Sequence, residues 1–280
     1  MEIREMITEI KGRLDTRGGL KAVIFVACGG SQAAIYPGKY LLEREANEIA
    51  VSIYNSNEFN YVTPKSLDER CIVICCSLKA TAETVHAVER ARQFGAVTIA
   101  MTGSPETGMA KAGEYVVVYS NGDEQIYSQS NQSMALRLGF EILHQFEGYP
   151  LYHEAMAAFD QIDAIVAESK RSMLPAAQSF AVEYQNDSLF QVLGAGPLYG
   201  TAYSMANCHF MEMHWRNAIM IHSGEYFHGP FEMTSETQPM ILLMATGRSR
   251  FLDERVLKFF KPYAKRFIVI DAKDTGIEEH

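Results

Sequence analysis

The sequence has few cysteines and little positive charge, and both scarcities exclude classes of protein. Its 280 residues hold 25 Lys and Arg against 34 Asp and Glu, for a net charge of -9. Nucleic-acid-binding proteins need a basic face to displace counterions from phosphates, so no nucleic-acid partner is expected. The five cysteines are odd in number and show no C-x-x-C spacing, which is typical of thiols in a reducing cytoplasm rather than of a disulfide framework.

Long apolar runs and nucleotide-binding motifs are also absent. No apolar stretch approaches the length of a membrane span, and the charged N-terminus lacks the apolar segment of a signal peptide. We therefore expect a cytoplasmic protein with no membrane partner. No GxxxxGK[ST] sequence occurs, which excludes a P-loop. The Gly-rich stretch at 194–200 has Pro197 at its tight turn, which disfavours a dinucleotide site.

The sequence does contain a series of short apolar runs separated by helical patterns. Such continuous runs are typical of parallel strands that are covered on both faces. Eight strands are expected, at 22–27, 49–54, 71–76, 97–101, 115–119, 189–193, 240–245 and 267–271. A long helical stretch at 152–183 separates the first five strands from the last three.

The two halves of the chain repeat one order of elements. Each half has a strand, a small-residue turn and a helix, then a second strand, a hydroxyl-bearing turn, a helix and another strand. Ser31 and Ser77, in the two turns of the first half, are 46 residues apart, and the corresponding turns of the second half are 50 apart. The predicted fold class is α/β, with two tandem doubly wound parallel-sheet units in residues 1–150 and 151–280. Each is expected to be a flavodoxin-like three-layer sandwich, the second preceded by linking helices.

Small and hydroxyl-bearing residues follow two strands of the first half. Ligands of doubly wound sheets bind beyond the carboxyl ends of the strands, where a helix N-terminus presents backbone N–H groups to an anion. We therefore interpret the turns after residues 27 and 76 as a phosphate site. Its candidate ligands are Gly29, Gly30, Ser31, Ser77, Lys79, Thr81 and Thr84. The alternative, that these residues serve only as helix N-caps, stays open.

A carboxylate and a histidine in the second half carry the candidate chemistry. Glu212 lies in an apolar helical run between Met211 and Met213, which are expected to pack in the core, and His228 follows 16 residues later in a turn bounded by Gly and Pro. An acid and an imidazole that converge from two elements could transfer a proton. The alternative is a solvated Glu212 and a structural His228. Neither HExxH nor HxxEH occurs, so no metal is expected.

Several segments of the chain resemble the sugar isomerase (SIS) domain family. The likeness is greatest to its fructosamine 6-phosphate deglycases and more distant to the isomerase half of glucosamine-6-phosphate synthase. It covers nearly the whole chain and rests on residues 25–29, 67–71, 94–98, 195–197, 211–212, 223–225 and 228–230. The 16-residue separation of Glu212 and His228 resembles that of the catalytic pair of the family.

This resemblance implies a tandem pair of SIS units that bind an open-chain ketose 6-phosphate with an amine at C1. Glu212 would move a proton between C1 and C2, giving an enaminol and then a C1 Schiff base that water hydrolyses to glucose 6-phosphate and free amine. His228 would act as acid or base at the ring or carbonyl oxygen, and Glu225 would shape the turn or contact the substrate. The resemblance also implies no cofactor, and a homodimer or higher homo-oligomer in which the histidine can come from a second subunit.

The sequence departs from the family pattern in two places. Many relatives have SxSGxT at the phosphate loop, whereas residues 77–82 keep the first serine and shift the threonine by one. Thr81 and Thr84 both stay candidates, and Lys79 could supply charge. The chain also ends at 274–280, just after a strand where relatives continue, so the second unit is expected to be short. Two other functions stay open: an aldose–ketose or amino-sugar phosphate isomerase with the same acid and base, and a non-catalytic sensor of sugar phosphates.

Overall fold

The computed structural model describes all residues except 121, 123 and 276–280. The chain forms two compact units, Met1–Asp163 (unit 1) and Ala164–His280 (unit 2). The end of the chain was predicted to follow shortly after the last strand, and residues 276–280 of that end lie outside the described residues. No helix in the described part of the chain is long and apolar enough to cross a membrane.

Unit 1 contains a five-stranded parallel sheet in the order β2-β1-β3-β4-β5. Its strands are β1 (Ala22–Ala27), β2 (Ala50–Tyr54), β3 (Cys71–Cys76), β4 (Val97–Thr102) and β5 (Tyr115–Val118). Its helices are α1 (Ile3–Asp15), α2 (Gly29–Glu45), α3 (Ser56–Tyr61), α4 (Ala82–Gln93), α5 (Gly108–Ala112), α6 (Asn131–Glu147) and α7 (Tyr152–Phe159), with a 3-10 turn η1 (Tyr127–Gln129). The five apolar runs predicted as strands in this half are confirmed.

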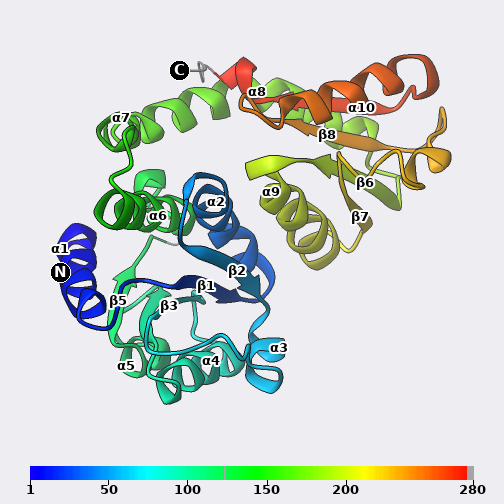
Figure 1. The fold of residues 1–280 in the computed structure, drawn as a ribbon. Helices are drawn as coiled ribbons and strands as arrows, with labels where there is room; N and C mark the ends of the chain where they lie inside the picture. Colours follow the sequence, from blue (N-terminus) through cyan, green and yellow to red (C-terminus); the bar gives the residue numbers. More distant parts are fainter. Residues whose placement is uncertain (121, 123, 276–280) are drawn as a thin grey trace. The chain divides into compact units, whose positions relative to one another are not determined.

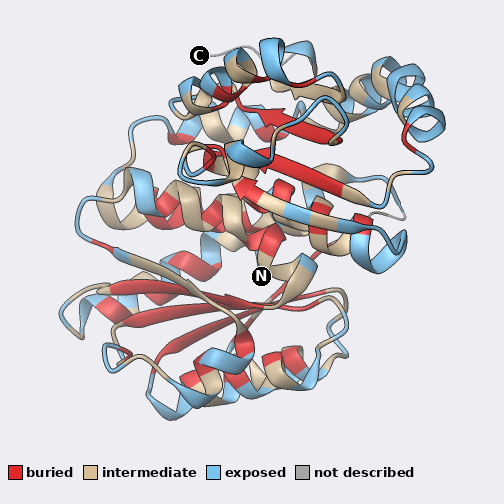
Figure 2. Ribbon diagram, turned by 90° about the vertical axis from the view of Figure 1, so that its right-hand side faces the viewer, coloured by how far each residue is buried: buried red, intermediate tan, exposed pale blue. Residues whose placement is uncertain are grey.

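Helices cover both faces of the unit 1 sheet (Figure 1). The helices α1, α2 and α6 share a core with Phe25 and Ile74, and α3, α4 and α5 share a second core with Val26 and Val73 on the opposite face. Strands β1, β3 and β4 are buried along their whole length (Figure 2). Burial on both faces explains why these strands are continuous apolar runs rather than alternating ones.

The order of strands in unit 1 reverses between β1 and β3. From β1 the chain continues to β2 on one side, and from β3 it continues to β4 on the other side. Strands β1 and β3 are direct neighbours, with Ala27 opposite Cys76 at their carboxyl ends. A crevice outside the carboxyl ends at such a switch point is where doubly wound sheets bind ligands.

Unit 2 repeats the first four strands of unit 1. Its parallel sheet has the order β7-β6-β8-β9, which matches β2-β1-β3-β4. The strands are β6 (Leu189–Gly194), β7 (Asn217–His222), β8 (Met240–Met244) and β9 (Phe267–Asp271). The helices are α8 (Ile162–Glu183), which begins at the boundary of unit 1, α9 (Tyr199–Ser204), the π-helix η3 (Met205–Met213) and α10 (Arg250–Tyr263), with 3-10 turns η2 (Gly196–Leu198), η4 (Pro230–Met233) and η5 (Ala272–Thr275). The predicted α/β class with two tandem doubly wound parallel sheets is confirmed.

Two elements differ from the prediction. Strand β7 was not predicted, because it is a short edge strand whose apolar run covers only residues 218–221, and of these Ile219 is exposed and Ile221 alone is buried. The helical stretch predicted at 152–183 is broken between α7 and α8. Phe159, at the end of α7, is buried against Phe140 of α6 with ring centroids 6.2 Å apart, and the chain turns directly after it.

Candidate functional site

Both candidate phosphate turns lie at the carboxyl edge of the unit 1 sheet. Gly29, Gly30 and Ser31 are the first three residues of α2, and Ser77 directly follows β3. The turns are neighbours because β1 and β3 are paired up to their carboxyl ends. The N–H groups of a first helical turn have no acceptor within the helix, so two sets of donors meet at this edge.

The turn after β3 is held by Ser77 and presents its next polar residues to solvent. Ser77 is 5% exposed, and its Oγ accepts a hydrogen bond from the Thr81 backbone N–H at 3.0 Å. Ala80 has a left-handed φ of 55° between them. Lys79 and Thr81 are exposed, and the Lys79 ammonium has no ion-pair partner among the described residues. The turn therefore offers a cation and a hydroxyl beside the N-terminus of α4.

Thr81 and Thr84 have different environments. Thr84 is 1% exposed, and its Oγ1 lies 2.9 Å from Ser56 Oγ and 3.1 Å from Thr81 Oγ1. Thr81 is the N-cap residue of α4, but its side chain caps no backbone N–H. Thr84 thus braces Thr81 from inside the protein, and the Thr81 hydroxyl keeps hydrogen-bonding capacity toward solvent.

Ser31 is positioned by buried groups that the sequence analysis did not single out. The Cys76 thiol donates a hydrogen bond to the Tyr119 hydroxyl at 3.8 Å, and the Ser31 side chain lies close to both groups. Burial raises the pKa of Cys76 to about 12 and also raises the pKa of Tyr119, so both groups keep their protons at neutral pH. Tyr119 is 3% exposed and directly follows Val118 at the end of β5, where its sequence signal is only that of a strand residue.

The apolar run around Glu212 does not enclose its carboxylate. Glu212 is exposed at the end of η3, and the buried residues of that helix are Ala206 and Phe210. Met211 and Met213 are 39% and 66% exposed, so their predicted packing in the core is wrong. The reason is local geometry, because the i→i+5 bonds of a π-helix change which residues face the sheet.

Glu212 and His228 lie at opposite ends of β7. The helix η3 leads from the carboxyl end of β6 to the amino end of the parallel β7, and Glu212 precedes the first residue of β7 by five residues. His228 follows the last residue of β7 by six residues, in two tight turns where Glu225 N–H donates to His222 O at 2.8 Å and His228 N–H donates to Glu225 O at 2.9 Å. A strand of this length spans about 17 Å, so the two side chains do not converge within one chain.

The turn that carries His228 is built on a neutral histidine. His222 Nδ1 accepts a hydrogen bond from Gly224 N–H at 3.0 Å, and its ring lies 5.3 Å from that of Tyr199. Burial lowers the pKa of His222, while the nearby Glu225 raises it. Glu225 and His228 have exposed side chains, and the backbone of Glu225 closes both tight turns.

The turn of unit 2 that corresponds to the Ser77 turn is filled by the protein itself. Asp253, in the first turn of α10, is fully buried, and its Oδ2 accepts from Ala245 N–H at 3.4 Å. Arg250 donates to Ala245 O at 3.0 Å and makes two hydrogen bonds to the Asp271 carboxylate, at 2.8 and 2.6 Å. Burial raises the pKa of Asp253 to about 6, while the nearby Ser223 hydroxyl, the hydrogen bond from Ala245 N–H and the charge of Arg250 lower it.

Asp253 was not identified from the sequence, because an acidic residue in a first helical turn is an ordinary helix-start signal. The described residues contain no group of three or more His, Cys, Asp or Glu side chains placed to hold a metal ion.

The fold defines a class of protein: a tandem α/β protein with two parallel sheets, in which the candidate phosphate turns lie at the switch point of the first sheet. A family model described as SIS domain matches residues 20–141. The chain is 38% identical over 272 residues to fructosamine deglycase FrlB of Bacillus subtilis, covering 97% of this chain and 81% of the relative. It is 28% identical over 254 residues to fructoselysine 6-phosphate deglycase of Escherichia coli, covering 89% of this chain and 72% of the relative. The chain belongs to the SIS-domain family, as its sequence predicted.

Solved structures show the same likeness. A protein from Salmonella typhimurium described as a phosphosugar isomerase has a TM-score of 0.93 at 39% identity, covering 98% of this chain and 83% of its own. The C-terminal domain of glucosamine-fructose-6-phosphate aminotransferase from Francisella tularensis has a TM-score of 0.80 at 17% identity, covering 92% and 75%. The second likeness is one of fold alone.

Proposed function

We propose that this protein deglycates fructosamine 6-phosphates to glucose 6-phosphate and a free amine. The observation that carries the proposal is the 38% identity with fructosamine deglycase FrlB across 97% of the chain. The chemical groups presented by the turns of unit 1 also support the proposal. A phosphate group is bound by backbone N–H groups, hydroxyls and a cation, and these are the groups that the turns present.

The phosphate of the substrate binds at the N-termini of α2 and α4. Backbone N–H groups at Gly29 and Gly30 and the Ser31 hydroxyl act from one turn, and Thr81 and Lys79 act from the other. Thr81 makes the contact rather than Thr84, because Thr84 is 1% exposed and already has two hydroxyl partners. Ser77 holds the backbone of the second turn in place through its bond from Thr81 N–H.

The reaction moves one proton and adds one water. In the open-chain substrate, C1 carries the amine and C2 the carbonyl. Glu212 takes a proton from C1 while the C2 oxygen gains a proton, which gives the enaminol, and return of a proton to C2 leaves a Schiff base between C1 and nitrogen. Water adds at C1, the bond between C1 and nitrogen breaks, and the products are glucose 6-phosphate and amine. The substrate's own C2 carbonyl accepts the electron pair left by the C1 proton, and its nitrogen then forms the double bond to C1, so the proposal includes no cofactor.

The acid or base at the substrate oxygen is His228 of a second copy of the chain. The position of the two residues at opposite ends of β7 supports this, because a strand of about 17 Å keeps them apart in one chain. In a dimer with two-fold symmetry the contacts are reciprocal, so Glu212 of each chain would meet His228 of the other chain, and the dimer would have two such sites. Glu225 shapes the turn on which that histidine sits.

The products of incubation test the function. The protein is mixed with fructosyl-amine 6-phosphates of several amines and separately with fructose 6-phosphate, and free amine and glucose 6-phosphate are measured. We expect equal amounts of both products from the amine adducts, absent in the Glu212→Gln variant. Conversion of fructose 6-phosphate without amine release from any adduct would instead identify an isomerase. Binding of the sugar phosphates without turnover would identify a sensor.

A further inference from the structure

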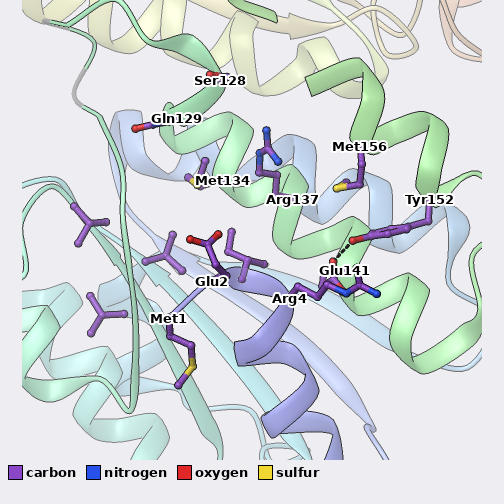
Figure 3. Close-up of a pocket in the computed structure, with 14 residues that line it drawn as sticks. Met1, Glu2, Arg4, Ser128, Gln129, Met134, Arg137, Glu141, Tyr152 and Met156 are labelled. Atoms are coloured by element: carbon purple, nitrogen blue, oxygen red, sulfur yellow. Dashed lines mark hydrogen bonds between the residues drawn. The ribbon is translucent and has the colours of Figure 1, made fainter. Parts of the chain in front are cut away.

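Unit 1 contains a cavity of about 490 Å³ that none of the proposed catalytic or phosphate-binding residues lines (Figure 3). It is bounded by the start of α1, by β5 and η1, and by α6 and α7. A volume of this size is typical of sites for small organic ligands. Its polar lining therefore indicates which ligand chemistry it suits.

Two arginines line this cavity without an ion-pair partner among the described residues. The Arg137 guanidinium carbon lies 4.2 Å from the centre of the Phe159 ring, and Arg137 Nε is buried without a hydrogen-bond partner. The Arg4 side chain has no hydrogen bond or ion pair within the described chain either. A buried donor without an acceptor costs free energy, so Arg137 in particular calls for an anionic group at this place.

A carboxylate lines the same cavity and is kept apart from Arg137. Glu141 is 3% exposed and lies one helical turn after Arg137 on α6, a spacing at which opposite charges commonly pair. They do not pair here. Figure 3 shows the Arg137 guanidinium directed away from Glu141, whose carboxylate is hydrogen-bonded to the Tyr152 hydroxyl and to Gln145 Nε2, the latter at 2.7 Å. Both signs of charge are thus presented to one cavity at separate places.

The remaining walls are mixed, with polar side chains at Glu2, Ser128 and Gln129 beside apolar ones. Met134 and Met156 project from α6 and α7 (Figure 3), and Val116 and Val118 of β5 also line the cavity. Unbranched thioether side chains adapt their shape to different apolar groups. A ligand for this cavity therefore carries a positive and a negative group and an apolar body.

We propose that this cavity binds a free α-amino acid. Its carboxylate pairs with Arg137, its ammonium with Glu141, and its side chain lies against Met134 and Met156. An α-amino acid carries its carboxylate and its ammonium on one carbon, so it can pair with both the positive and the negative side chains of the cavity. Inorganic phosphate would satisfy the arginines but not the carboxylate. The proposal does not depend on the deglycation reaction, because it concerns binding alone.

Calorimetric titration of the whole chain with L-leucine tests this proposal. Two matched analogues separate the charges: L-leucinamide lacks the carboxylate, and N-acetyl-L-leucine lacks the ammonium. We expect leucine to bind, and each analogue to bind at least about tenfold more weakly, because each loses a charge-assisted contact. Equal binding of all three compounds, or no binding of leucine, overturns the proposal.

Substitutions locate the binding. Arg137→Gln and Glu141→Gln are each expected to weaken leucine binding at least about tenfold. Arg44→Gln is the matched control, since Arg44 also lies over an aromatic ring of unit 1, 5.3 Å from the centre of Tyr40, but does not line the cavity. Leucine binding to Arg137→Gln that equals binding to the control contradicts the proposal.

A third variant tests leucine binding in the cavity if Arg137→Gln or Glu141→Gln fails to fold. Val118 lines the cavity from a side chain that is 47% exposed, so Val118→Trp fills the space with little cost to the core. We expect this variant to keep the far-ultraviolet circular dichroism of the parent and to lose leucine binding. Unchanged binding in the folded Val118→Trp protein overturns the proposal.

Discussion

The two units share one topology, but only the first leaves its second turn open. After β3, the chain has Ser77 and the N-cap residue Thr81, and the side chains between and beyond them reach solvent. After β8, the same positions carry Ala245 and Ser249, and the backbone of Ala245 is bonded by Asp253 and Arg250. A fold places a ligand site at its switch point, but particular side chains decide whether a ligand can enter.

In unit 2 the candidate residues lie at a different place in the same topology. Its candidate chemistry lies on the two segments that flank the edge strand β7, with Glu212 before the strand and His228 after it. The counterpart strand in unit 1, β2, follows α2 directly and carries no candidate residue. The comparison separates anion binding in unit 1 from proton transfer in unit 2, and each assignment can be broken on its own.

The largest effect is expected at the acid and base of unit 2. Glu212→Gln and His228→Asn should each lower kcat by about 10²- to 10⁴-fold, the usual worth of a positioned acid or base, with little change in KM. Steady-state kinetics on a fructosyl-amine 6-phosphate measures this. Glu225→Gln, in the same turn, is the control and should lower kcat far less. A near-normal kcat in Glu212→Gln would remove that residue from the mechanism.

The next effect concerns the carboxylate that fills the turn of unit 2. The pKa of Asp253 is about 6 in the folded chain, against 3.8 for an ordinary aspartate, so the folded state holds this proton more tightly than the unfolded one. The stability from this group is present below about pH 4 and is lost as pH rises through about 6, by about 3 kcal/mol at most. Asp253→Asn should therefore raise the free energy of unfolding at pH 8 more than at pH 5.

Urea unfolding at several pH values measures this difference. Glu254→Gln is the matched control, because it removes a carboxylate from the same helix that is bonded to the same Arg250, at 2.9 Å, but lies at the surface. A stability difference between Asp253→Asn and the parent that stays constant from pH 5 to pH 8 would contradict the raised pKa.

The smallest effect compares the two turns directly. Thr81→Val in unit 1 should raise KM by about tenfold, the loss expected from one hydrogen bond to a charged group, and Ser77→Ala should raise KM because it releases the backbone N–H of Thr81. Ser249→Ala, at the N-cap position of α10 that corresponds to Thr81, should leave KM unchanged. If Ser249→Ala and Thr81→Val change KM equally, the assignment of the phosphate to unit 1 is wrong.

Much of the fold could be predicted because strands that are buried on both faces have continuous apolar runs in the sequence. The run Cys71–Cys76 became β3 at the predicted residues, and Phe267–Asp271 became β9. The edge strand Asn217–His222 escaped prediction, since its apolar run is only four residues long and follows a helix within a few residues. Period and length carry the signal for a strand, and an edge strand has the weaker form of both.

The site could be predicted in its residue types but not in its arrangement. Thr81 and Thr84 are equivalent in sequence, and only the contact of Thr84 with Ser56, far along the chain, shows which of them is buried. The exposure of Glu212 follows from a π-helix, and the residue pattern of Met205–Met213 does not predict a π-helix. These features depend on tertiary contacts and on backbone hydrogen bonding, and neither has a local sequence signal.

The measurement that tests the account most directly mixes two inactive chains. Glu212→Gln and His228→Asn proteins are unfolded, combined in equal amounts, refolded together and assayed for amine release. If Glu212 acts with His228 of a second copy, half of the dimers are mixed and each has one intact site, so about a quarter of the parent activity returns. If no activity returns above that of either variant refolded alone, the two residues act within one chain or not at all, and the account is contradicted.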